Sequence, residues 1–159
     1  EFVYSMIYHR HRRDFSEFLL HHIMTMVLIS YSYLINFLPI GAAIMLVMDV
    51  SDIFVALFKM TVDVYLKVQD FFFLLMTVTW TYIRIYFFPV FIVIPYYYEI
   101  KDDPNPVIQQ FAYILMAFLW GLHILNMYWL YLMLRGAFAR YLAKEKTDIN
   151  FKVAVQKDN

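Results

Sequence analysis

The chain alternates between long apolar runs and short polar or turn-forming stretches. Each run has about 18 residues or more, enough at ~1.5 Å of helical rise per residue to cross ~30 Å of hydrocarbon. Strands of a membrane barrel would alternate polar and apolar positions over about 10 residues, and these runs do not. The pattern therefore predicts an all-α membrane protein, a bundle of about four transmembrane helices. The runs cover approximately residues 15–37, 40–66, 71–88 and 107–139.

Turn-forming and charged residues separate the runs. The stretch 36–41 contains Asn, Pro and Gly, and it ends the first helix. Polar residues at 67–70 separate the second helix from the third. The third helix is predicted to end around Pro89 and Pro95, and the acidic loop 99–106 precedes the fourth.

The composition supports a location in a membrane. Hydrophobic residues make up 63% of the 159 residues, aromatic residues 21% and charged residues 16%, with a formal net charge of +0. A soluble domain of this size does not bury so large an apolar fraction. The charges are confined to short stretches, as expected when the rest of the chain faces hydrocarbon, and nucleic acid is not an expected partner.

The residues at hand limit the chemistry and the domain organisation. The chain has no cysteine, which excludes disulfides, thiolate nucleophiles and zinc sites of the cysteine type. We expect no metal site and no permanently bound cofactor.

The chain begins without an initiator methionine or a signal-peptide pattern, so we expect a fragment of a longer protein with helices upstream. We divide it into a transmembrane domain, 1–146, and a polar C-terminal tail, 147–159.

Basic residues are distributed unevenly among the loops. With four crossings, the cluster 9–13, Lys67 and the basic residues from Arg135 onward fall on one side of the membrane. Because cytosolic loops are enriched in Lys and Arg, we predict that this side is cytosolic. The opposite side receives the turn at 36–39 and the acidic loop.

Two adjacent histidines, His21 and His22, lie in the first run, ~10 Å from its cytosolic end at the standard helical rise. Neighbouring residues project about 100° apart on a helix, so one imidazole can line a cavity while the other packs. They are either interfacial histidines that reach toward the headgroups or the centre of acid–base or nucleophilic chemistry.

Charged residues occur in the interior of the second and third runs. Asp49 and Asp52 are three residues apart, which places both carboxylates on one helical face. A charge at this depth costs a few kcal/mol unless it is paired or wet, so this face is predicted to point into the bundle. Lys59 follows on the same face and either neutralises Asp52 or contacts a phosphate. We expect a membrane aspartate as the partner of Arg84, in the third run.

The fourth run carries polar residues that share a face. His123 and Asn126 are three residues apart. Lone polar side chains of this kind usually form hydrogen bonds between helices, and we expect that role for both. Gly121 is expected to allow close approach of a neighbouring helix.

A series of short motifs runs in order along the chain. The motifs are Arg12-Arg13-Asp14-Phe15, His21-His22 with Thr25, Ser32 to Phe37, Met48 to Asp52, Lys59-Met60, Trp80 with Arg84 and Pro89, and Leu125 to Trp129. This series resembles the TLC domain family and, within it, the Lag1 motif of ceramide synthases, over about residues 12 to 135. The resemblance implies that these helices belong to a larger TLC-type bundle.

The resemblance also implies a reaction, the transfer of a fatty acyl group from acyl-CoA to the amine of a sphingoid base in the endoplasmic reticulum membrane. His21 or His22 would take the acyl group or the amine proton, and Asp49 or Asp52 would orient the imidazole. Acyl-CoA is then a co-substrate, and membrane lipid and other copies or subunits are the further expected partners. The predicted contacts of the coenzyme A phosphates are Arg10, Arg12, Arg13 and Lys59, although the arginines equally suit a role as cytosolic anchors.

Three positions depart from the family pattern. Met48 stands where the motif has histidine, Ala56 where it has glutamate and Pro39 where it has arginine. A methionine cannot accept a proton, so a mechanism that needs this histidine is lost. Two functions remain open at this point: an acyltransferase, or a catalytically degenerate TLC protein that binds lipid or serves as a structural subunit of a larger membrane complex.

Overall fold

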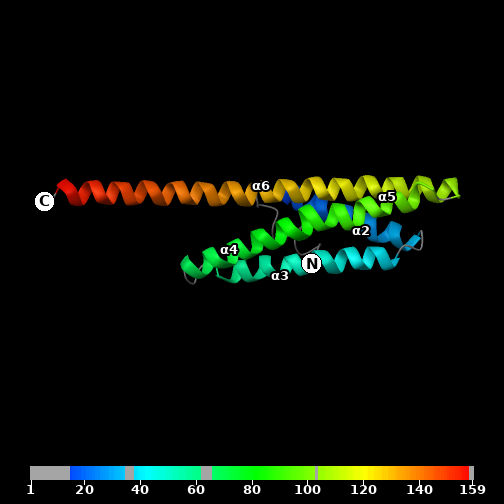
Figure 1. Cartoon of the computed structure of the whole chain (residues 1–159), viewed down its shortest axis with the longest axis horizontal. Coiled ribbons are helices and arrows are strands. Elements are labelled where there is room, and N and C mark those ends of the chain that lie inside the picture. The colour runs from blue at the N-terminus through cyan, green and yellow to red at the C-terminus, as the bar shows by residue number, and fades with distance from the viewer. Residues whose placement is uncertain (1–14, 35–37, 62–65, 103, 158–159) are drawn as a thin grey trace. The chain divides into compact units, whose positions relative to one another are not determined.

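The computed structural model describes residues 15–34, 38–61, 66–102 and 104–157 (Figure 1). Regular structure in these ranges is helical throughout, without a strand. The predicted all-α bundle is therefore confirmed. The elements are α2 (Phe15–Leu34), α3 (Leu38–Thr61), α4 (Leu66–Trp80), the π-helix η1 (Thr81–Val93), α5 (Ile94–Ile100) and α6 (Pro106–Lys157).

Three of the described helices are long and apolar enough to span a membrane. These are Gly41–Thr61, Val68–Ile100 and Pro106–Ala143. α2, which the sequence predicts to be a fourth crossing, has 20 residues and contains both histidines of the pair. The chain is therefore an integral membrane protein, and among the described helices α2 is not one of those that meet this criterion of length and hydropathy.

The third predicted helix continues past both prolines. α4, η1 and α5 follow one another without a break from Leu66 to Ile100, so the predicted end around Pro89 and Pro95 is wrong. In η1 the backbone bonds span five residues, as in the bond from the Ile94 N–H to the Pro89 carbonyl oxygen. Such local π-helical adjustment and neighbouring side chains satisfy the backbone groups that a proline frees in a membrane helix.

The chain divides into two compact units, residues 1–127 and 128–159, and α6 contributes to both. In the second unit, α6 continues as helix to Lys157, beyond the end predicted for the fourth run. The boundary between a domain ending at 146 and a tail beginning at 147 stays a prediction.

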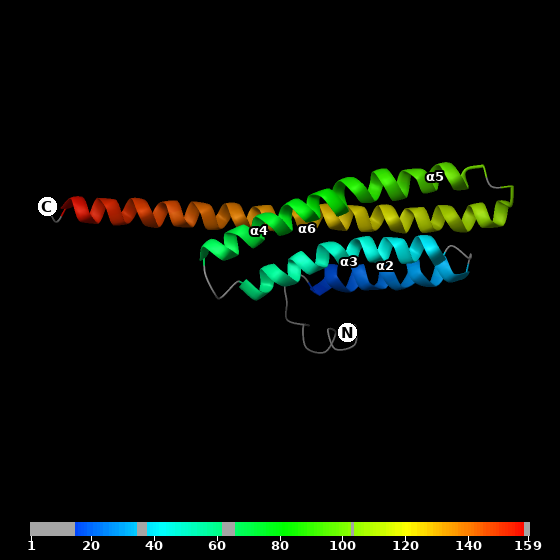
Figure 2. The same cartoon turned by 60° about the horizontal axis from the view of Figure 1, so that its bottom comes forward.

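Within the first unit, α2 and α3 form a hairpin, and α3 lies beside α4 (Figures 1 and 2). Glycines allow the backbones to approach closely. A Cβ at Gly41 would lie 2.5 Å from Ser32 Oγ, where α3 meets α2, and a Cβ at Gly121 would lie 2.5 Å from Met24 Cε, where α6 meets α2. α2 is thereby held against two helices.

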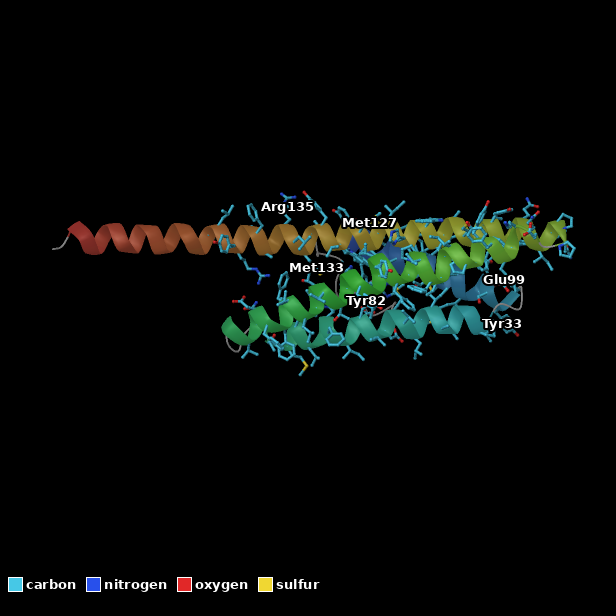
Figure 3. The ribbon with its side chains drawn as sticks, in the orientation of Figure 1. Tyr33, Tyr82, Glu99, Met127, Met133 and Arg135 are labelled. Atoms are coloured by element: carbon cyan, nitrogen blue, oxygen red, sulfur yellow. The ribbon has the colours of Figure 1, made fainter. Side chains whose placement is uncertain are left out.

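The core of the first unit joins η1 and α5 to the first part of α6. Partly buried residues of α2 and α3, such as Leu28 and Met48, pack against it. Its buried members are Phe88, Val93, Tyr96, Ile100, Ala112, Leu115 and Leu119. Large apolar and aromatic side chains also project outward, among them Tyr33 and Tyr82 (Figure 3). Exposed apolar surface of this kind is expected of helices that face lipid.

Candidate functional site

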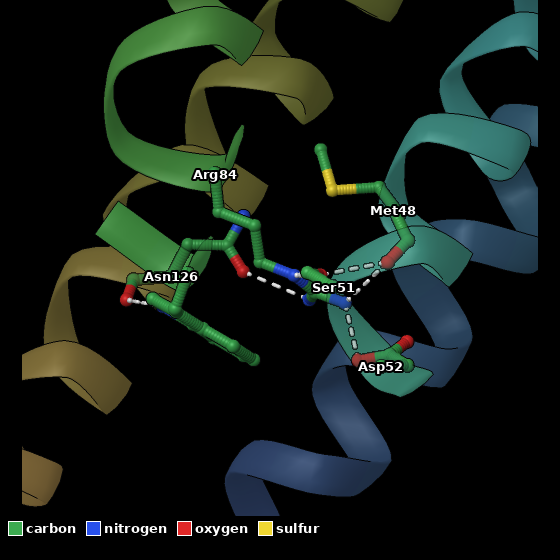
Figure 4. A network of polar contacts seen from close by, with 6 residues as sticks. Met48, Ser51, Asp52, Arg84 and Asn126 are labelled. Atoms are coloured by element: carbon green, nitrogen blue, oxygen red, sulfur yellow. Dashed lines mark hydrogen bonds and ion pairs between the residues drawn. The ribbon is translucent and has the colours of Figure 1, made fainter. Parts of the chain in front are cut away.

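A buried arginine organises the polar groups of the first unit. Arg84, in the first turns of η1, is only 2% exposed. Its Nε donates to Ser51 Oγ at 2.6 Å, and its Nη2 forms an ion pair with Asp52 Oδ1 at 2.6 Å (Figure 4). Nη1 donates to Asn126 Oδ1 at 3.3 Å, and Nη2 also donates to the Met48 carbonyl oxygen at 3.2 Å. We call these five residues the Arg84 network; it joins α3, η1 and α6.

Trp80 supports the guanidinium from one side. The Arg84 Cζ atom lies 4.1 Å from the centroid of the Trp80 ring, a distance suited to a cation–π contact. The indole Nε1 donates to the Asn126 carbonyl oxygen at 3.2 Å. The two residues are four apart along one continuous helix, and this spacing places them on the same face. Trp80 therefore fixes both Arg84 and the α6 backbone that faces it.

The electrostatics of the network are asymmetric. The Arg84 side chain is 3% exposed, whereas that of Asp52 is 56% exposed. A buried guanidinium requires an opposite charge and hydrogen-bond acceptors, which Asp52 and three neutral oxygens provide. The predicted pairing of Arg84 with a membrane aspartate is thus present. Asp49 and Lys59 are both exposed on α3.

The histidine pair lies on α2 with its rings 5.6 Å apart, edge to face. His22 Nδ1 lies 2.9 Å from the Phe18 carbonyl oxygen, and Thr25 Oγ1 donates to the His22 carbonyl oxygen at 2.9 Å. Because a carbonyl oxygen can only accept, His22 Nδ1 must carry the proton of this bond. In the neutral ring, the lone pair therefore resides on Nε2.

The described residues place α2 close to the network. α2 packs against α3 at Gly41 and against α6 at Gly121, and these two helices supply the partners of the Arg84 guanidinium. Both histidines are partly buried. The predicted coenzyme A contacts Arg10, Arg12 and Arg13 lie outside the described residues.

The remaining predicted positions are on the periphery or within the network. Pro39 and Ala56 are exposed on α3. The Met48 side chain packs against the core, and the Met48 carbonyl oxygen accepts a hydrogen bond from Arg84. In the part of the chain that the structure describes, no group of three or more His, Cys, Asp or Glu side chains could hold a metal ion.

Several members of the network were not predicted as partners of Arg84. Ser51 directly precedes Asp52, which the sequence analysis names as a site residue. Trp80 is four residues before Arg84, and this spacing indicates that the two side chains share a helical face. The interhelical bonds expected of Asn126 and His123 are both present, and both go to Arg84. Asn126 accepts from its guanidinium, and His123 Nδ1 lies 3.3 Å from its carbonyl oxygen.

Comparison with known proteins gives a consistent result. Residues 1–135 match the model of a family described as the TLC domain. The chain is 29% identical over 140 residues to ceramide synthase 1 LOH3 of Arabidopsis thaliana, covering 84% of this chain and 46% of that protein. It is 33% identical over 125 residues to ceramide synthase 4 of Homo sapiens, with 78% and 31% covered.

A fungal relative agrees. Ceramide synthase LAG1 of Saccharomyces cerevisiae is 33% identical over 136 residues, covering 78% of this chain and 32% of that protein. The chain spans less than half the length of each of these relatives.

Proposed function

Because the chain belongs to the TLC domain family, we propose that it is a ceramide synthase-like acyltransferase of the endoplasmic reticulum membrane. The reaction is the transfer of a fatty acyl group from acyl-CoA to the amine of a sphingoid base. Relatives named as ceramide synthases in plant, human and yeast support this assignment. The long apolar helices suit two lipid substrates.

The proposed reaction requires a base that removes protons from the sphingoid-base nitrogen. The amine nitrogen attacks the thioester carbon, the new C–N bond forms, and the C–S bond breaks as coenzyme A leaves as a thiolate. The sphingoid base enters as an ammonium, which loses one proton to give the nucleophilic amine and a second proton as the amide forms. Imidazole exchanges protons near neutral pH and suits this task. We assign it to His22 Nε2, with His21 beside it.

The observation that carries the proposal is the orientation of His22. Its Nδ1–H is bonded to the Phe18 carbonyl oxygen, so the basic nitrogen of the neutral ring is Nε2. A base held in one tautomer by a backbone carbonyl needs no reorientation before it accepts a proton. Asp52, held on one oxygen by Arg84, is the proposed counter-charge for the imidazolium that results.

Binding of acyl-CoA is proposed for the cytosolic end of the bundle. Lys59 lies in the last turn of α3 and is exposed, as a contact for a phosphate requires. Arg10, Arg12 and Arg13 are the further proposed contacts, because guanidinium groups bind phosphates in a bidentate manner.

The test uses the complete protein in lipid nanodiscs, supplied with acyl-CoA and sphinganine. His22→Asn keeps a donor near the position of Nδ1 but removes the basic nitrogen, so ceramide formation should fall by about 10²–10⁴-fold. The control is Tyr33→Phe, since Tyr33 is 72% exposed on the same helix and should not affect turnover. Full activity of a well-folded His22→Asn variant would refute the role of His22.

A second function, lipid binding or subunit assembly without catalysis, is favoured by Met48. The Arg84 network uses the backbone carbonyl oxygen of residue 48, which any residue provides. Met48 therefore keeps this hydrogen bond, although it lacks the imidazole that the family motif has at this position. In this case folded protein binds a fluorescent sphingoid base but forms no ceramide, and His21→Ala and His22→Ala leave binding unchanged. Ceramide formation by the unmodified protein would eliminate this alternative.

A further inference from the structure

Pro89 leaves a gap in the hydrogen bonds of η1. In this π-helix a backbone N–H bonds the carbonyl five residues earlier, as Ile94 does with Pro89. The Arg84 carbonyl would therefore accept from residue 89, but a proline has no N–H. Both residues are buried, and a buried carbonyl without a donor is unfavourable.

His123 supplies the missing donor from α6. Its Nδ1 lies 3.3 Å from the Arg84 carbonyl oxygen, and the ring is buried at 7% exposure. The oxygen can only accept, so Nδ1 carries the proton. The ring is held between Trp120, whose ring centroid is 5.6 Å away and edge to face, and Phe88, whose centroid is 6.3 Å away. The imidazole thus has a defined orientation and tautomer.

α6 thereby holds Arg84 at both ends. Asn126 accepts a hydrogen bond from the guanidinium, and His123 donates one to the carbonyl. The two residues are three positions apart and share one face of α6. The long arginine side chain reaches Ser51 and Asp52 only if its backbone is correctly placed relative to α3.

We propose that His123 is a positioning residue whose Nδ1–H replaces the backbone N–H that Pro89 lacks and so fixes Arg84 for its contacts with Ser51 and Asp52. The proposal rests on the proposed function and deepens it, because Arg84 holds Asp52, the carboxylate proposed as the counter-charge of the His22 imidazolium. Its tests measure stability and protonation rather than acyl transfer, so they are decided whether or not the protein is an enzyme.

The first test is a double-mutant cycle in nanodiscs. His123→Leu removes the donor and should lower the midpoint of thermal unfolding by roughly 2–10 °C, as expected when one buried polar group loses its partner in a chain of this size. Pro89→Ala restores a backbone N–H at position 89. In the Pro89→Ala background, His123→Leu should lower the midpoint of thermal unfolding by no more than about half of its effect in the unmodified protein. An equal loss in both backgrounds would overturn the proposal.

The second test replaces the His123 imidazole with amide side chains of two lengths. Asn places an amide N–H near the position of Nδ1, whereas Gln places it near Nε2. His123→Asn should therefore retain most of the thermal stability that both His123→Leu and His123→Gln lose. Rescue by Gln and not by Asn would contradict the proposed bond.

The third test measures the unmodified protein, and a variant serves only to assign the signal. In protein with ¹⁵N-labelled histidine, the His123 spectrum should show a protonated Nδ1 bonded to a carbonyl, and the signal should be assigned by its loss in His123→Asn. A neutral ring with its proton on Nε2 alone would refute the proposal.

Discussion

Arg84 is the residue on which the buried polar groups depend. A guanidinium presents five N–H donors in one plane, and four of them find acceptors here, three from α3 and one from α6. Only one of these acceptors, Asp52, carries a charge. Since Arg84 is buried and Asp52 is half exposed, the two partners should not be equivalent when either is removed.

We predict that Asp52→Ala destabilises the protein more than Arg84→Met does. Loss of Asp52 leaves a buried positive charge without a counter-charge, which typically costs about 3–5 kcal/mol. Loss of Arg84 leaves a carboxylate that can become neutral by taking up a proton, whereas a guanidinium stays charged. Reversible unfolding in mixed micelles measures both.

The double variant Asp52→Ala with Arg84→Met provides the control for this pair. Because it removes both charges, it should be more stable than Asp52→Ala alone. If the two single variants were equally stable, and the double variant lost the sum of both effects, charge pairing would not explain the network.

At the scale of elements, the spacing of α2, which carries both histidines, depends on the glycines that face it. Two close approaches set that spacing, Gly41 against Ser32 and Gly121 against Met24. The neighbours differ in their freedom to move. Met24 Cε is the end of a flexible side chain, whereas Ser32 Oγ is joined to the backbone through Cβ alone, and that Cβ would itself lie 3.1 Å from the added atom.

The glycines are therefore predicted to differ in their tolerance of alanine. Gly41→Ala should lower thermal stability more than Gly121→Ala, because the Met24 end group can shift and Ser32 cannot. Gly136→Ala is the matched control: nothing lies within 4 Å of its added Cβ, and alanine favours a helix over glycine by up to about 1 kcal/mol. A series of melting curves in which Gly136→Ala is the most harmful would contradict this packing.

At the scale of the whole molecule, the orientation in the membrane is the property that the basic residues predict. Val68–Ile100 is one continuous apolar span, so Lys67 and Asp102, at its two ends, belong to opposite sides of the membrane. The predicted cytosolic side carries the basic residues, and it is the side from which acyl-CoA would approach.

Cysteine accessibility tests this orientation without a background, since the chain has no native cysteine. Lys67→Cys should react with a membrane-impermeant maleimide from the cytosolic side of microsomes. Asp102→Cys should react only after the lumen is opened. Labelling of both from the same side would show that the number of crossings between them is not one.

Much of the fold followed from properties that are local in the chain. The length of an apolar run compared with bilayer thickness predicts a crossing, and a buried arginine requires an acidic partner. Both arguments use only neighbouring residues and the solvent. Among the described residues, three of the four predicted crossings are long and apolar enough to span a membrane, and Arg84 is paired with Asp52. The histidine pair and the aspartates were recognised because their spacing forms a motif; their catalytic roles stay predictions.

The contacts of the site required the folded arrangement. The hydrogen bonds of Arg84 and Trp80 join residues 32 to 46 positions apart, and no local pattern specifies which oxygen meets which donor. The continuation of the helix through Pro89 was missed for the same reason. A proline ends a helix in water, but here a π-helical turn and the distant His123 satisfy the carbonyl it frees. Composition and spacing determine which groups are buried together; the packing of α3, η1 and α6 determines how their hydrogen bonds are satisfied.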